Sequence, residues 1–236
     1  KYEEIEEISL KIKLNRFNNF RAEDILTFFE NYGIDNGESF KQILKVIIKA
    51  KTGDENYTFK QLYEKYNKKL VITVTCLNNL KCEYLNFETN PNMEIIDAIM
   101  MSICVPFLFK PISFNNKLYV DGALLNHYPI DYFKDEKMET FGIIVTDPIN
   151  EPKTINNFND YLYLIFNCSF LYNNKKCYDY YKQNTILLES TQNFLDFNID
   201  YNTKISLIEQ AFTKTKNYII TDDFKTYFNL ESNNSK

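Results

Sequence analysis

The residues best suited to do chemistry lie in a short segment, residues 118–129 of this 236-residue chain. A short apolar run, which predicts a strand, ends at Asp121, and Gly122 and Ala123 follow directly. Glycine permits a turn that a side chain would obstruct, and groups at the carboxyl ends of strands in α/β proteins face the ligand crevice. Asp121 is therefore a candidate general base. The alternative is that its carboxylate only orders a turn, which Asp does well.

Other polar side chains are weaker candidates. Ser102 lies in a helical pattern and not in a turn that would expose it as a nucleophile. His127 is the only histidine of the sequence, but its nearness to Asp121 in sequence does not supply the geometry of a triad. We expect His127 to order a loop. Asp147 follows an apolar run and precedes Pro148, so we expect it to form a turn.

The composition narrows the classes of partner. Apolar residues make up 44% of the chain and charged residues 25%, which are ordinary values for a globular domain. The net charge of −5 gives no electrostatic footprint for nucleic acid. No apolar run approaches the roughly 20 residues of a transmembrane segment. Five irregularly spaced cysteines and one histidine form no zinc pattern, so we expect no metal, no cofactor and an intracellular, cytoplasmic protein with reduced thiols.

The elements that must position Asp121 are predicted helices and strands, and Thr58 with Gln61 makes a capping box ahead of the apolar residues that follow it. Apolar periodicity predicts helices over residues 2–12, 23–31, 40–48, 93–102, 158–181 and 204–218. Strands are predicted at residues 70–76, 83–88, 118–120, 140–145 and 185–189. The run at 140–145 is apolar throughout, as in a strand buried on both faces, and residues 32–37 read as a turn. We expect a single domain over residues 1–230 and a frayed tail at 231–236.

The order of motifs ahead of Asp121 resembles the patatin-like phospholipase family. An Ala-Ile-x-x-Ser helix occurs at residues 98–102, a Pro-x-x-Phe-x-Pro segment at residues 106–111 and an Asp-Gly-Ala box at residues 121–123. The resemblance implies an α/β fold, a three-layer α/β/α sandwich with a mainly parallel central sheet. It also implies hydrolysis of lipid esters of the phospholipase A type by a Ser–Asp dyad, in which Asp121 accepts the proton of the serine.

The resemblance implies supporting residues and partners as well. Pro106 belongs to the segment before the box, and Asn126 and His127 belong to the segment after it. The family usually has Asn at the position of His127, so His127 is a departure there, and we expect Asn126 to take over its hydrogen bond. The implied partner is a phospholipid or another lipid ester, with transient contact at a membrane surface. The aromatic-rich region 161–181 is a candidate for that contact, although most of its rings suit a core.

Half of the family's machinery does not occur in the sequence. None of the five glycines flanks a serine in a Gly-x-Ser-x-Gly elbow, and there is no Gly-rich loop. We expect the chain to begin just after the nucleophile segment, to be inactive by itself and to expose an apolar edge where a strand is missing. Two alternatives stay open: a non-catalytic lipid-binding or scaffolding protein derived from the family, and an α/β domain with an incidental Asp-Gly turn.

Overall fold

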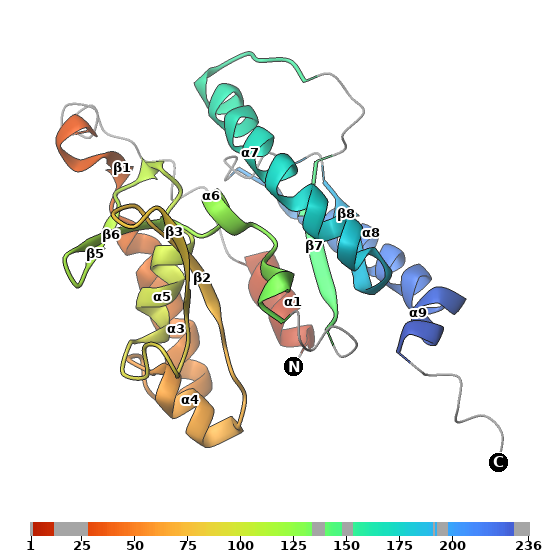
Figure 1. Ribbon diagram of the computed structural model, residues 1–236, viewed down its shortest axis with the longest axis horizontal. Coiled ribbons are helices and arrows are strands. Elements are labelled where there is room, and N and C mark those ends of the chain that lie inside the picture. The colour runs from red at the N-terminus through yellow and green to blue at the C-terminus, as the bar shows by residue number, and fades with distance from the viewer. Residues whose placement is uncertain are drawn as a thin grey trace. The chain divides into compact units, whose positions relative to one another are not determined.

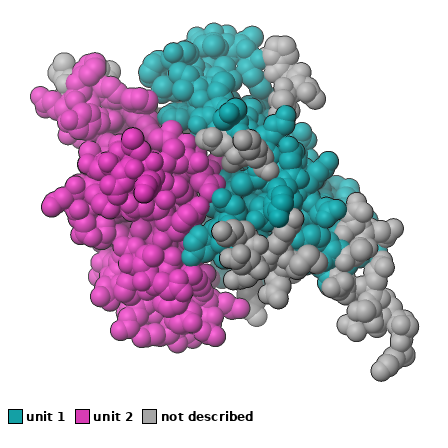
Figure 2. All heavy atoms as spheres, viewed as in Figure 1, with its two compact units in different colours: residues 1–15, 128–236 teal, residues 16–127 magenta. Residues whose placement is uncertain are grey.

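The computed structural model describes residues 2–11, 28–133, 140–147, 153–190, 192 and 198–228. The chain divides into two compact units, which are described one at a time: residues 16–127, and residues 1–15 with 128–236 (Figure 2). The expectation of a single domain over residues 1–230 stays a prediction. Of the helix predicted at residues 23–31, residues 28–31 are helical. Residues 23–27 and the tail at 231–236 lie outside the described residues.

The unit of residues 16–127 contains both helices and short strands (Figure 1). Its helices include α3 (Glu38–Thr52), α4 (Phe59–Tyr66), α5 (Ile95–Ser102) and α6 (Ala123–Asn126). Its strands are β1 (Gly33–Asp35), β2 (Ile72–Cys76), β3 (Lys81–Leu85), β4 (Phe107–Phe109), β5 (Ile112–Phe114) and β6 (Lys117–Asp121). The prediction of a turn at residues 32–37 missed β1, because this strand forms by parallel pairing with the distant β4.

Four strands of this unit form a sheet in the order β3-β2-β6-β5, and every pair in it is antiparallel. Asn115 and Asn116 join β5 to β6 with φ angles of 50° and 60°. Two residues with positive φ form the tight turn that suits a hairpin. In the adjacent pair, Asp121 lies opposite Val74 of β2. The candidate base is thus fixed to an inner strand of the sheet.

Helix α5 packs on β2 and β6 and forms the core of this unit with them. The core includes Val74, Tyr119, Ala98 and Met101, all buried. The apolar pattern of α5 therefore faces the sheet, and this contact places the end of the helix beside the end of β6. At α4, the predicted capping box is confirmed between Thr58 and Gln61.

The other unit is built on two parallel strands, β7 (Gly142–Thr146) and β8 (Thr185–Glu189). The long helix α7 (Phe158–Tyr181) and the turn η3 (Lys182–Asn184) connect them. This unit also contains the helices α1 (Tyr2–Lys11), α8 (Tyr201–Ile219) and α9 (Asp222–Tyr227). The α/β class is confirmed, with parallel pairing at β7–β8 and at β1–β4. None of the helices in the described ranges is long and apolar enough to cross a bilayer.

Strand β7 corrects one prediction. Its apolar run was expected to be buried on both faces, yet Ile144 is buried whereas Ile143 is 57% exposed and Val145 is also exposed. Helix α8 packs on β8, so only part of this sheet face is covered within the described residues. Composition alone cannot reveal whether the second face of an apolar strand has a packing partner.

Candidate active site

The backbone of Asp121 is held from two directions. Asp121 is the last residue of β6, and it pairs with Val74 of β2. Its backbone N–H donates to the carbonyl oxygen of Cys104 at 2.9 Å. The segment that follows α5 therefore fixes the end of β6. The predicted position of Asp121 at the end of a strand is confirmed.

The carboxylate of Asp121 is partly buried and has one hydrogen bond from the turn that follows it. The Ala123 N–H donates to its Oδ1 at 2.8 Å. Among the described residues, no Lys or Arg forms an ion pair with Asp121 and no hydrogen bond engages Oδ2. Burial raises the pKa of Asp121 to about 6, and the Ala123 N–H offsets only part of this rise. Such a carboxyl group can accept a proton near neutral pH.

Gly122 is required by close packing and not by its backbone conformation. Its φ is −63°, which any residue can adopt. A Cβ added at this position would lie 2.2 Å from the carbonyl oxygen of Thr73 in β2, far inside any normal contact. The glycine therefore lets the chain pass directly beside β2, and this path brings the Ala123 N–H onto Asp121.

Two residues near the end of α5 surround the Asp-Gly turn. The Ser102 carbonyl oxygen accepts a hydrogen bond from the Gly122 N–H at 3.4 Å. The Cys104 thiol is buried and donates to the carbonyl oxygen of Lys110 at 3.1 Å. Burial, with a smaller contribution from the charge of Asp121, raises the pKa of this thiol to about 12. The Cys104 thiol therefore stays protonated and is a poor nucleophile; sequence reasoning had not identified it as a neighbour of Asp121.

Asn126 ties the turn after Asp121 to the edge of the sheet. Its side-chain Nδ2 donates to the hydroxyl oxygen of Tyr84 in β3 at 3.0 Å, and its backbone N–H donates to the carbonyl oxygen of Gly122 at 3.0 Å. His127 follows at the end of α6 and is partly buried. The contact of Asn126 with Tyr84 could not be found from sequence, because it joins positions that are far apart in the chain.

Pro106 lies in the turn before β4 and is also partly buried. The next residue, Phe107, has a φ of 70°, an uncommon conformation for a bulky side chain. Phe107 begins β4 and pairs with Gly33 of β1. The family-like Pro-x-x-Phe-x-Pro segment is thus a strained connection that leads from α5 toward β5.

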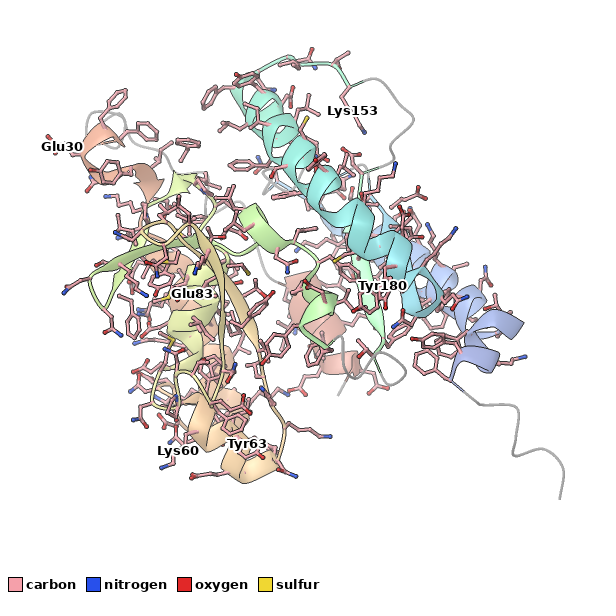
Figure 3. All side chains as sticks on the ribbon, viewed as in Figure 1. Glu30, Lys60, Tyr63, Glu83, Lys153 and Tyr180 are labelled. Atoms are coloured by element: carbon pink, nitrogen blue, oxygen red, sulfur yellow. The ribbon has the colours of Figure 1, made fainter. Side chains whose placement is uncertain are left out.

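A second strand-end acid, Asp147, is compensated in a way that Asp121 is not. It follows β7 and is 7% exposed. The Tyr163 hydroxyl of α7 donates to its Oδ2 at 2.6 Å, and Lys153 Nζ lies 2.7 Å from its Oδ1 (Lys153 is labelled in Figure 3). Sequence reasoning assigned a turn to Asp147 and missed both partners. In the parts of the chain that are described, no group of three or more His, Cys, Asp or Glu side chains could hold a metal ion.

Comparisons with known proteins agree with these motifs. A profile of the Patatin-like phospholipase family matches residues 1–134. An uncharacterized protein of Acanthamoeba polyphaga mimivirus is 30% identical over 208 residues, which are 82% of this chain and 67% of that protein. A probable lipid hydrolase of Invertebrate iridescent virus 6 is 32% identical over 99 residues, 42% of this chain and 34% of that protein. The chain belongs to the patatin-like phospholipase family.

Proposed function

We propose that this chain carries the base of a lipid acyl hydrolase, with Asp121 as the proton acceptor of a Ser–Asp dyad. The observation that carries the proposal is the state of Asp121: a partly buried carboxylate at a strand end, with a pKa raised to about 6 and without a compensating cation among the described residues. Membership of the family and the relative described as a probable lipid hydrolase support phospholipids or other lipid esters as the substrate class.

In the proposed reaction, a serine hydroxyl attacks the ester carbonyl carbon while its proton passes to Asp121. Backbone N–H groups stabilise the oxyanion of the tetrahedral intermediate. The C–O bond to the alcohol then breaks, and the alcohol leaves with the proton from Asp121. Water hydrolyses the acyl-enzyme by the same transfer in reverse. A carboxylate with a pKa of about 6 is a stronger base than an ordinary Asp and is still mostly ionised at pH 7.

The proposal places the nucleophile and the oxyanion loop in polypeptide outside these 236 residues, because no serine among them lies in a Gly-x-Ser-x-Gly elbow. Asp121, Gly122 and Ala123 then form the acid half of the site, with Asn126, His127 and Pro106 as supporting residues. Five irregularly spaced cysteines with a single histidine are typical of reduced thiols, and this pattern supports a cytoplasmic location. The chain alone is expected to be inactive.

The same lack of a serine elbow favours a second candidate function, a non-catalytic lipid-binding or scaffolding protein derived from the family. On this reading Asp121 only orders its turn, as its hydrogen bond from Ala123 allows. The two candidates differ in one measurable property, which is the breaking of an ester bond.

The test compares two polypeptides. One, called the uninterrupted polypeptide, is translated from the whole open reading frame in which this sequence lies, and the other is limited to the 236 residues. Each is incubated with a fluorogenic phospholipid and with a serine-directed fluorophosphonate probe. We expect hydrolysis and covalent labelling for the uninterrupted polypeptide and neither for the 236 residues. Lipid binding by the uninterrupted polypeptide without hydrolysis or labelling would contradict the hydrolase and support the scaffold.

A further inference from the structure

Helix α7 has two apolar faces, and only one of them is buried. Tyr163, Phe166 and Tyr181 are buried on the inner face. The opposite face carries large apolar and aromatic residues at alternating spacings of three and four, which places them in one row along the helix. This outer stripe consists of the exposed residues Phe158, Tyr161, Ile165, Cys168 and Tyr172. Tyr172 is 80% exposed. A helix that is apolar on both faces is normally covered on both.

The rotation of α7 about its axis is fixed by polar contacts at its start. The Asn157 side chain caps the helix by accepting from the Asp160 N–H at 2.9 Å. The Tyr163 hydroxyl donates to the buried Asp147 at 2.6 Å. Because Tyr163 is held on the inner face, the outer stripe stays turned away from β7. Figure 1 shows α7 as one continuous helix, which gives the stripe a straight surface.

The chemistry of the stripe favours a lipid surface over a protein partner. Residues 161–174, fourteen in succession, include no charged side chain. A partner helix docked on a row of this spacing would normally be oriented by charges that flank the row, and these are missing along that stretch. Tyrosine and phenylalanine are the residues that settle at the boundary between head groups and acyl chains.

We propose that the outer stripe of α7 docks the protein on the surface of a zwitterionic bilayer, with the helix lying in the plane of the interface. The net charge of −5 and the uncharged stripe give no attraction to anionic lipids. Binding is therefore expected to depend little on salt and not to require anionic head groups. The choice of lipid as the occupant rests on the proposed lipid hydrolase function, because such an enzyme must reach substrate held in a membrane.

The chain contains no tryptophan, so a single introduced one is a clean fluorescence reporter. Tyr172→Trp places it on the stripe, and Phe212→Trp places the control at a residue of α8 that is 68% exposed. With phosphatidylcholine vesicles, we expect a blue shift of emission for the first variant and none for the second. The absence of a shift, an equal shift in both, or a shift that follows protein concentration without vesicles would overturn the proposal; the last would assign the stripe to a second copy of the chain.

A set of substitutions measures the affinity. The triple variant Tyr161→Asn, Ile165→Asn and Tyr172→Asn is expected to weaken vesicle cosedimentation roughly tenfold or more. A matched triple variant of residues exposed in the same unit, Tyr201→Asn, Phe212→Asn and Ile220→Asn, should bind like the wild type. Equal binding by both triple variants and the wild type would contradict the proposal. If the first triple variant does not fold, the emission shift of the conservative Tyr172→Trp variant tests the proposal instead.

Vesicle binding and ester hydrolysis depend on different residues of the protein. Asp121→Asn should bind vesicles as the wild type does, because Asp121 is not part of the stripe. Failure of the wild-type uninterrupted polypeptide to hydrolyse lipid esters, with intact vesicle binding, would count against the dyad alone. Hydrolysis of a soluble short-chain ester by the uninterrupted polypeptide, without any vesicle binding, would count against the stripe alone.

Discussion

Asp121 and Asp147 are two acids at the ends of two strands, and the protein treats them differently. Asp147 is almost fully buried, with Lys153 and the Tyr163 hydroxyl on its two oxygens. Asp121 receives one backbone hydrogen bond, from Ala123. Burial raises the pKa of Asp121 to about 6. Within the described residues, no positively charged side chain pairs with Asp121 to lower this pKa again. The charge of Asp147 is compensated by its partners, whereas Asp121 is able to take up a proton.

A buried acid indicates chemistry only when the groups that compensate its charge are known. Burying a carboxylate is costly unless it is paired and hydrogen-bonded. At Asp147 the pairing offsets that cost and joins β7 to α7, which is a structural role. At Asp121 the cost stays in the fold, and this is the pattern expected where function and not stability selects the residue.

The largest expected effect separates the two acids by activity. In the uninterrupted polypeptide, Asp121→Asn should lower ester hydrolysis roughly 10²- to 10⁴-fold, the range for loss of a general base. Asp147→Asn should leave the turnover of the folded protein nearly unchanged. Hydrolysis rates, normalised to the folded fraction by circular dichroism, check this. Equal losses in the two variants would mean that the acids do not have separate roles.

The next effect concerns pH and stability. The folded-state pKa of Asp121, about 6, lies above its ordinary value of 3.8, so the native state binds more protons than the unfolded state between these values. The contribution of Asp121 to the free energy of unfolding is fully present below pH 3.8. It is lost as the pH rises through about 6, by up to about 3 kcal/mol. The free energy of unfolding of Asp121→Asn, measured with urea, should therefore rise relative to that of the wild type between pH 4 and pH 7. A constant difference across that range would contradict the raised pKa.

Removing the cation beside Asp147 should cost less. Lys153→Met leaves a buried carboxylate without its ion pair, and we expect a loss of about 2–3 kcal/mol in the free energy of unfolding. The matched control is Lys214→Met, whose pair with Glu189 at 3.0 Å is about half exposed on both sides. That pair should contribute under about 1 kcal/mol. Similar losses in the two variants would remove the distinction between a buried and an exposed pair.

The smallest effect tests why glycine follows Asp121. Gly122→Ala would place a methyl group 2.2 Å from the Thr73 carbonyl oxygen, so we expect a destabilisation of about 2 kcal/mol. Gly53→Ala is the control, because nothing lies within 4 Å of its added Cβ although its φ is 86°. Its strain should cost only about 1 kcal/mol. If Gly53→Ala lost more stability in urea unfolding, close packing at Gly122 would not be the reason for its glycine.

Local signals in the sequence predicted much of the fold. The apolar periodicity of α3 and α7, the Thr58–Gln61 capping box and the β-branched run of β2 each depend on neighbours in the chain, and each was found in the structure. The position of Asp121 at a strand end was predicted in the same way. Its role as a base stays a prediction that rests on the family and on its burial.

Features that depend on distant residues could not be predicted. Strand β1 needs its partner β4, the exposure of Ile143 depends on what covers β7, and Tyr84 meets Asn126 only through the sheet. The sequence predicted that a side chain at position 122 would obstruct the turn, but the contact of Gly122 with β2 cannot be read from an Asp-Gly pair. In each case tertiary packing decides, and no local pattern encodes it.

We infer that Asp121 is a partly buried acid without a compensating cation among the described residues, and its own titration tests this most directly. The carboxyl carbon of Asp121 can be followed by NMR between pH 2 and pH 8 in the 236-residue chain, with Asp121→Asn used to assign the signal. We predict a pKa of about 6. A value at or below the ordinary 3.8 would show that the carboxylate is stabilised as an ion, and it would contradict the assignment of Asp121 as a base.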